Sequence, residues 1–116
     1  MINDIKKICF DIDGVICTIS KDYALAKPIK KNIHFINELY NKKYYIVLFT
    51  ARFMGRNNDN KTLAIKNAKK LTINQLNKWN IKYNKLIFGK PSYDILIDDK
   101  ALFFKKNWIS SLKSKL

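Results

Sequence analysis

The acidic residues are the part of this sequence best suited to chemistry. Only nine of its 116 residues are Asp or Glu. Four of these form two close pairs, Asp11 with Asp13 and Asp98 with Asp99, each at the end of an apolar run. Two carboxylates so close repel each other and shift each other's pKa, which a bound cation relieves. Because Mg²⁺ prefers carboxylate oxygens, the pairs indicate a magnesium site where strands end.

Alternating apolar segments predict the elements that would position these acids. Four apolar runs are typical of strands buried on both faces: residues 5–12, 44–49, 85–88 and 93–97. Two segments have apolar side chains at helical spacing: residues 28–43 and 61–79. The stretch 100–116 is expected to form a short basic helix that packs on the sheet or on a partner subunit. This order predicts one α/β domain over residues 1–116, a Rossmann-like parallel sheet of about four to five strands flanked by helices.

Polar residues follow several of the predicted strands. Ligands bind at the carboxyl ends of the strands in such sheets. Asp11, Thr50, Lys90 and Asp98 lie at or just beyond those ends, although they come from four separate segments. We therefore expect a single polar site at this edge of the sheet.

Four motifs in this order resemble the haloacid dehalogenase (HAD) superfamily of phosphatases and phosphotransferases. They are CFDIDGVIC at residues 9–17, LFTAR at 48–52, FGKPSYD at 88–94 and ILIDDKA at 95–101. The resemblance extends from the first predicted strand to residue 101. It implies a HAD-like core and an enzyme that transfers phosphoryl groups.

The resemblance also implies a role for each matching residue. Asp11 would be the nucleophile that forms an aspartyl-phosphate. Asp13 would protonate the leaving oxygen and then activate the water that hydrolyses the intermediate. Thr50 and the backbone at Ala51 would hold phosphate oxygens, and Lys90 would neutralise negative charge. An acid at position 13 favours phosphate ester hydrolysis over dehalogenation within the superfamily.

The metal implied by the resemblance is Mg²⁺. Its ligands would be Asp11, the backbone carbonyl of Asp13 and Asp98, with Asp99 as a neighbour whose share of the metal is open.

The sequence departs from many HAD enzymes because it has no room for a cap domain. Only residues 14–27 separate the first motif from the first predicted helix, and no cap-sized insertion lies between Arg52 and Lys90. The site should therefore be open, so that a large substrate or a neighbouring subunit covers it. Arg52 and Arg56, in a turn-rich loop, are candidates to bind a second phosphate or a carboxylate of the substrate. Solvated loop charges are the alternative.

Together these features predict an Mg²⁺-dependent phosphomonoester hydrolase. The wording of residues 50–60 and 90–101 resembles small HAD proteins found with surface-polysaccharide genes, so the expected substrate is a sugar phosphate or related metabolite. One alternative is a phosphatase of nucleic-acid 3′ ends, which an open site and a net charge of +14 would suit. Another is a non-catalytic HAD-like module that binds a phosphorylated ligand or a protein.

Composition and charge limit the cellular compartment and the partners that we expect for this protein. The lysines are scattered rather than blocked, so the charge also fits a solvated basic surface. No apolar run approaches the roughly 20 residues of a membrane span. A disulfide scaffold is not expected, because the chain has only two cysteines. We expect Cys9 to lie in the core and Cys17 to be more exposed. A cytoplasmic protein that binds a small phosphorylated substrate is expected, and the uncovered site favours a homo-oligomer.

Overall fold

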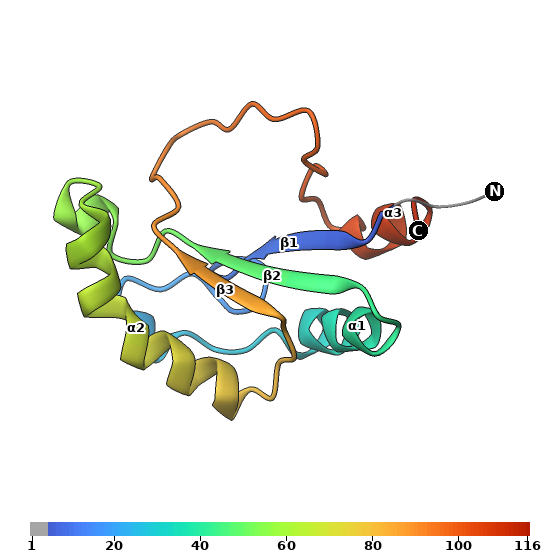
Figure 1. The fold of residues 1–116 in the computed structure, drawn as a ribbon, viewed down its shortest axis with the longest axis horizontal. Coiled ribbons are helices and arrows are strands. Elements are labelled where there is room, and N and C mark those ends of the chain that lie inside the picture. Colours follow the sequence, from blue (N-terminus) through green and yellow to red (C-terminus); the bar gives the residue numbers. More distant parts are fainter. Residues whose placement is uncertain (1–4) are drawn as a thin grey trace.

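A computed structural model describes residues 5–116, and a three-stranded parallel sheet lies at its centre (Figure 1). The strands are β1 (Lys7–Asp11), β2 (Tyr45–Thr50) and β3 (Lys85–Phe88), in the order β1-β2-β3. Both pairs of neighbours are parallel. The predicted parallel α/β architecture without a cap domain is confirmed, although the sheet has three strands rather than four or five.

Helices flank this sheet. They are α1 (Lys30–Asn41), α2 (Lys61–Lys78) and the short α3 (Trp108–Lys113), with 3₁₀ turns η1 (Tyr23–Leu25) and η2 (Gly55–Asn57). Both long helices lie where apolar spacing predicts them. Asn60 begins α2 by accepting a hydrogen bond from the Leu63 N–H at 3.1 Å. Within residues 5–116, no helix is long and apolar enough to cross a membrane.

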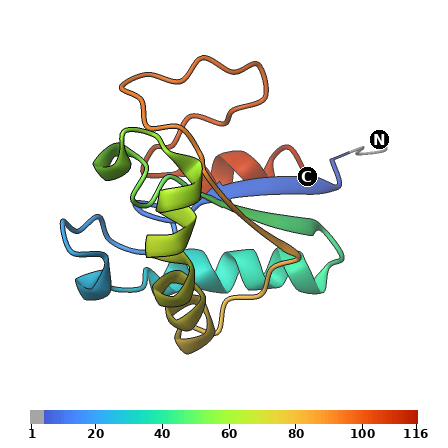
Figure 2. The same cartoon turned by 60° about the vertical axis from the view of Figure 1, so that its left-hand side comes forward.

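The predicted strand at residues 93–97 is wrong, and chain length gives the reason. Only four residues, 89–92, follow β3 before this run. A parallel neighbour in the same sheet needs a crossover of a dozen residues or more. Residues 91–107 instead form an extended loop, called the arch below, which stands away from the sheet in both views (Figures 1 and 2).

The arch is anchored at its far end by Trp108. The Trp108 ring packs edge-on against Phe10 of β1 and Phe35 of α1, with ring centroids 6.1 and 5.7 Å apart. The predicted C-terminal helix therefore packs on the body of the protein.

The two cysteines occupy places opposite to those expected. Cys17 is fully buried in the core, whereas Cys9 on β1 is exposed.

Candidate active site

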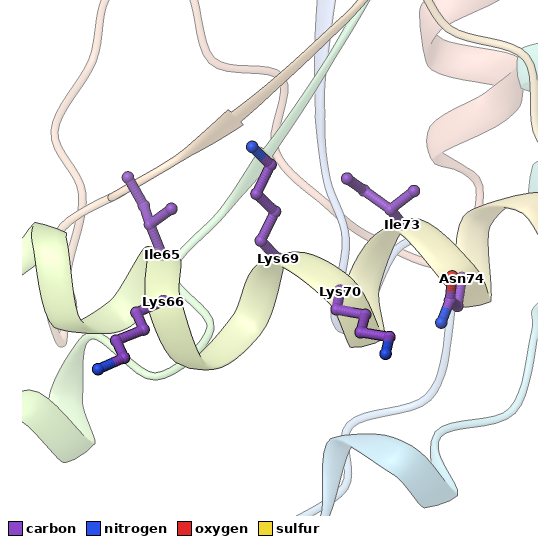
Figure 3. A pocket seen from close by; sticks show the side chains of 6 residues that line it. All are labelled: Ile65, Lys66, Lys69, Lys70, Ile73 and Asn74. Carbon is purple, nitrogen blue, oxygen red and sulfur yellow. The ribbon is translucent and has the colours of Figure 1, made fainter.

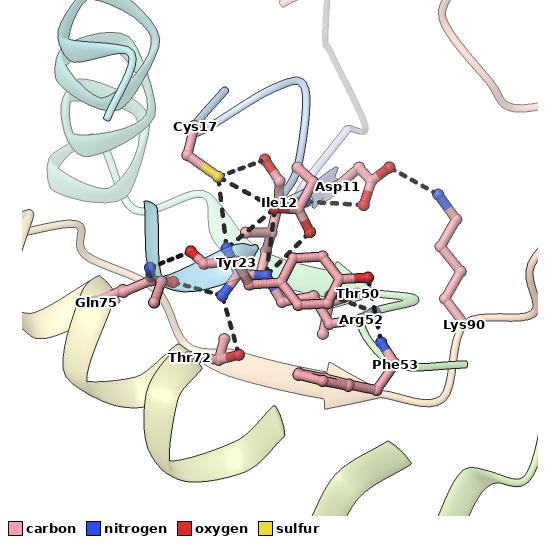
Figure 4. A network of polar contacts seen from close by, with 12 residues as sticks. Asp11, Ile12, Cys17, Tyr23, Thr50, Arg52, Phe53, Thr72, Gln75 and Lys90 are labelled. Atoms are coloured by element: carbon pink, nitrogen blue, oxygen red, sulfur yellow. Dashed lines mark hydrogen bonds and ion pairs between the residues drawn. The ribbon is translucent and has the colours of Figure 1, made fainter. Parts of the chain in front are cut away.

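Three of the four expected segments meet at the carboxyl ends of the strands. Asp11 ends β1 and lies opposite Phe49 of β2, one position before Thr50. Lys90 follows β3, and its backbone N–H donates to the Thr50 carbonyl at 3.1 Å. Its Nζ donates to Oδ2 of Asp11 at 3.0 Å (Figure 4). The polar site expected at this edge is therefore formed by Asp11, Thr50 and Lys90.

Asp11 is held at both oxygens but remains accessible. The Ile12 N–H donates to its Oδ1 at 2.8 Å, while Lys90 occupies Oδ2. The Asp11 side chain is 38% exposed. It is therefore a carboxylate held in place with an open side toward solvent, which suits a nucleophile.

Lys90 is a well-shielded cation beside that carboxylate, with a side chain 13% exposed. Burial alone would lower the pKa of Lys90, but its interactions with Tyr93 and Asp11 outweigh burial and raise the pKa. Gly89, at φ +87°, makes the left-handed turn that precedes Lys90, a conformation that favours glycine. The amine therefore stays protonated and can balance negative charge at Asp11.

A second ion pair fixes Asp13. The Arg52 guanidinium donates from Nε to Oδ2 and from Nη2 to Oδ1 of Asp13, both at 3.0 Å. The Arg52 side chain is 0% exposed and that of Asp13 is 21% exposed. This two-pronged geometry sets the direction of the carboxylate as well as its charge.

The remaining donors of Arg52 are also satisfied inside the chain. Its Nη1 donates to Thr72 Oγ1 at 3.2 Å and to Gln75 Oε1, both on α2. Its guanidinium lies 5.1 Å from the centroid of the Tyr23 ring. The structure thus places Arg52 in the interior, with no donor left over, rather than on a loop surface. We assign it to positioning Asp13 instead of binding substrate.

Sequence reasoning missed Thr72 and Gln75. Both lie on the buried stripe of α2, where Ala68 and Leu76 are their neighbours in helical spacing. Polar residues on a stripe that should be apolar indicate a buried polar partner, since unpaired groups there are costly. That signal was present in the sequence.

Cys17 completes the packing around Asp13. Its thiol donates to Asp13 Oδ1 at 3.4 Å, and Arg52 Nη2 donates to the sulfur at 3.6 Å. Burial, followed by the charge of Asp13, raises the pKa of Cys17 to about 12. The thiol is therefore protonated near neutral pH and is not a nucleophile there.

Thr50 and Ala51 form the turn after β2. Thr50 is buried, and its Oγ1 accepts from the Arg52 N–H at 3.0 Å, which fixes the turn. Ala51 is half-buried. Thr50 directly follows Phe49, the β2 residue that pairs with Asp11, and Ala51 comes next.

Arg56 lies at the mouth of this region and is exposed. Its guanidinium stacks 4.5 Å from the Tyr23 ring and 5.2 Å from the Phe53 ring, and it donates to the Lys21 carbonyl. It therefore joins the flap, residues 14–27, to the loop after β2.

The second acidic pair does not join the site. Asp98 and Asp99 lie exposed in the arch, and Asp98 accepts a hydrogen bond from the nearby Lys100 N–H at 2.8 Å. Among residues 5–116, no group of three or more His, Cys, Asp or Glu side chains could hold a metal ion. Asp11 and Asp13 already balance the charges of Lys90 and Arg52. The described chain alone therefore does not fit the expected Mg²⁺ ligand set.

A surface hollow on α2 lies apart from these residues. It is lined by Ile65, Lys69 and Ile73 on one side and by Lys66, Lys70 and Asn74 on the other (Figure 3). It contains no carboxylate or other group suited to catalysis. We therefore place the candidate active site at Asp11 and Asp13.

Comparisons with known proteins define the fold but not the activity. No protein-family model matches the chain, and no curated protein matches its sequence. A crystal structure of a structural-genomics target from Vibrio cholerae is similar, with a TM-score of 0.78 and 25% sequence identity. The match covers 95% of this chain and 98% of that one. The name of that structure states no family and no activity.

Proposed function

We propose that this chain is a capless member of the HAD superfamily that hydrolyses phosphomonoesters through an aspartyl-phosphate at Asp11. One observation carries the proposal. Two carboxylates only two residues apart are paired with different cations, Asp11 with Lys90 and Asp13 with Arg52. Separate environments give neighbouring carboxylates separate roles, as acid–base catalysis requires.

In the first step, an oxygen of Asp11 attacks phosphorus while the bond from phosphorus to the leaving oxygen breaks. Asp13 transfers its proton to that oxygen, so the leaving group departs as an alcohol. Lys90 balances the charge shared by Asp11 and the phosphoryl group. Thr50 and the backbone at Ala51 bind phosphoryl oxygens in this proposal.

In the second step, Asp13 accepts a proton from water, whose oxygen attacks phosphorus and releases Asp11. Inorganic phosphate leaves, and both carboxylates return to their starting states. The two hydrogen bonds from Arg52 hold the Asp13 carboxyl group in one orientation for both steps. We retain Mg²⁺ as the proposed cofactor, where it would neutralise phosphoryl charge.

The proposed substrate is a small phosphorylated metabolite, such as a sugar phosphate of surface-polysaccharide synthesis in the cytoplasm. The resemblance of residues 50–60 and 90–101 supports this choice. An open mouth flanked by Arg56 supports a substrate with a second negative group. Nucleic acid is not favoured because the basic side chains are scattered over the sequence.

The test is phosphate release from a panel of sugar phosphates, nucleotides and 3′-phosphorylated oligonucleotides, with and without Mg²⁺. Asp11→Asn should abolish release. The matched control, Glu38→Gln, changes an exposed carboxylate on α1 and should leave release unchanged. Release only from oligonucleotides would favour the 3′-end alternative. Binding of phosphorylated compounds without turnover would favour the binding module.

A further inference from the structure

Among the described residues, the outer edge of β1 and the apolar segment 93–97 pair with no other strand. β1 is the last strand of the sheet, and its Lys7 and Cys9 are exposed. In the arch, Ile95 is 80% exposed and Ile97 is 95% exposed. Within residues 5–116, no backbone hydrogen bond involves residues 93–97. An apolar extended segment with free backbone groups is suited to pairing with a sheet edge.

The arch cannot reach β1 of its own chain as a parallel strand. The new strand would begin at the amino end of the sheet, three strand spacings from β3. For a strand that begins with Asp94 beside Lys7, three spacings of about 4.8 Å and a return of about 16 Å along the strands make a straight path of about 22 Å through the sheet. The six Cα steps from Phe88 to Asp94 span at most about 20–22 Å when fully extended, and the left-handed turn at Gly89 shortens this reach. A path around a face of the sheet is longer still.

We propose that two copies of this chain exchange their arches, so that residues 94–98 of each copy pair in parallel with the outer edge of β1 in the other. The corresponding register places Asp94 beside Lys7, Leu96 beside Cys9 and Asp98 beside Asp11 of the partner subunit. A second copy satisfies the geometry because its β1 edge is not limited by the short connection after β3.

Charge favours this pairing. The chain has a net charge of +14, so two copies repel each other over most of their surfaces. The arch carries three of the nine acidic residues, and Asp94 would meet the basic start of β1, at Lys6 and Lys7. The apolar side chains of residues 95–97 suit a strand that becomes buried on both faces.

The exchange would also complete the active site, a consequence that rests on the proposed function. Within residues 5–116 of a single chain, no third acidic side chain joins Asp11 and Asp13 in a group that could hold a metal ion. In the proposed register, Asp98 of the partner subunit arrives at the carboxyl end of β1. Each site would then contain a nucleophile from one chain and an acidic ligand from the other.

Cross-linking tests the exchange without any activity. Leu96→Cys places a thiol opposite the natural Cys9 of the partner, and mild oxidation should give a covalent dimer. Ile19→Cys, an equally accessible thiol outside the arch, should give no such dimer. A disulfide within one chain, or a monomer in solution that does not cross-link, would overturn the proposal.

A second pair of variants guards against a Leu96→Cys protein that fails to fold. Light scattering of the natural chain should give the mass of a dimer. Ile97→Lys should give the mass of a monomer, whereas Leu25→Lys, another exposed apolar position, should remain a dimer. A monomeric natural chain, or a dimer that survives Ile97→Lys, would contradict the exchange.

Mixing tests the composite site. Asp11→Asn and Asp98→Asn chains should each be inactive alone. After unfolding and refolding together in equal amounts, half of the dimers contain both chains and one of their two sites is intact. The mixture should therefore recover about one quarter of the natural activity. No recovery with proven mixed dimers would overturn the shared site, whereas an inactive natural chain that cross-links would overturn only the proposed function.

Discussion

The surroundings of Arg52 and the arch differ in how far their polar groups are paired by hydrogen bonds. The Arg52 side chain is fully buried, and each of its nitrogen atoms has a partner within the chain. Residues 93–97 make no backbone hydrogen bond among the described residues and expose their apolar side chains. The polar groups around Arg52 are therefore paired within one chain, whereas the arch has the properties of a surface that binds a partner.

Each region carries an acid of the proposed site. Asp13 is fixed by Arg52 before any ligand arrives, so its orientation needs no further adjustment. Asp98 is fixed only by a local contact with Lys100. The difference suggests that folding of one chain positions the acid–base residue, while association positions the additional acid.

Among the substitutions considered, replacing Arg52 should lower the free energy of unfolding most. Arg52→Met leaves the half-buried Asp13 without its cation and leaves the buried Thr72 and Gln75 without their donor. It should lower the free energy of unfolding by about 3 kcal/mol. Urea unfolding measures this effect. Arg56→Met, at an exposed arginine, should change it by less than about 0.5 kcal/mol. Equal effects of the two variants would show that the Asp13–Arg52 pair adds no more to stability than an exposed arginine does.

A smaller loss is expected from the second layer of contacts. Gln75→Leu removes an acceptor from Arg52 and a donor to the Tyr23 carbonyl. The cost of leaving such groups unpaired is about 1–3 kcal/mol. Thermal and urea unfolding should both detect it, and Gln75→Glu should restore part of the stability by returning an acceptor. Full stability in Gln75→Leu would contradict the network.

Alkaline pH should weaken the buried region through Cys17. Below pH 9 the thiol is protonated in both folded and unfolded chains and has no effect on the pH dependence. Above pH 9 it ionises in the unfolded chain but stays protonated in the folded one up to about pH 12. Stability should then fall by about 1.4 kcal/mol per pH unit from this group. In Cys17→Ala the free energy of unfolding should fall less steeply with pH. An unchanged slope would contradict the raised pKa of Cys17.

The arch should affect association but hardly affect the folding of one chain. A dimer becomes more stable as the protein concentration rises, because association favours the folded state. The urea midpoint of the natural chain should therefore rise with concentration, and that of Ile97→Lys should not. A midpoint that is independent of concentration in both proteins would place the arch outside any interface.

Local patterns in the sequence predicted the elements of the protein well. The apolar runs and helical spacings located β1, β2, β3, α1 and α2, because burial imposes a period on each element. The expected strand at 93–97 failed because its apolar pattern was considered without the four-residue connection before it. The apolar pattern indicates that a segment can be buried, but it does not specify which strand edge that segment pairs with.

The candidate site was predicted in part. Asp11, Thr50 and Lys90 meet because parallel strands end at one edge. The pairing of Asp13 with Arg52 spans 39 residues and depends on how the turn after β2 folds over α2. Arg52 was therefore interpreted as a candidate to bind substrate, with a solvated loop charge as the alternative. Contacts between distant residues of this kind depend on tertiary packing, which no local pattern records.

The residue that carries phosphate during turnover would identify the nucleophile. The protein is mixed with a substrate that it hydrolyses, quenched in acid within the first turnover, and its peptides are analysed by mass spectrometry. We expect phosphate on Asp11. With an aryl phosphate, whose leaving oxygen needs no proton, we expect a larger amount in Asp13→Asn because the water is no longer activated. Turnover with phosphate on another residue, or with none on the protein, would contradict the proposed mechanism.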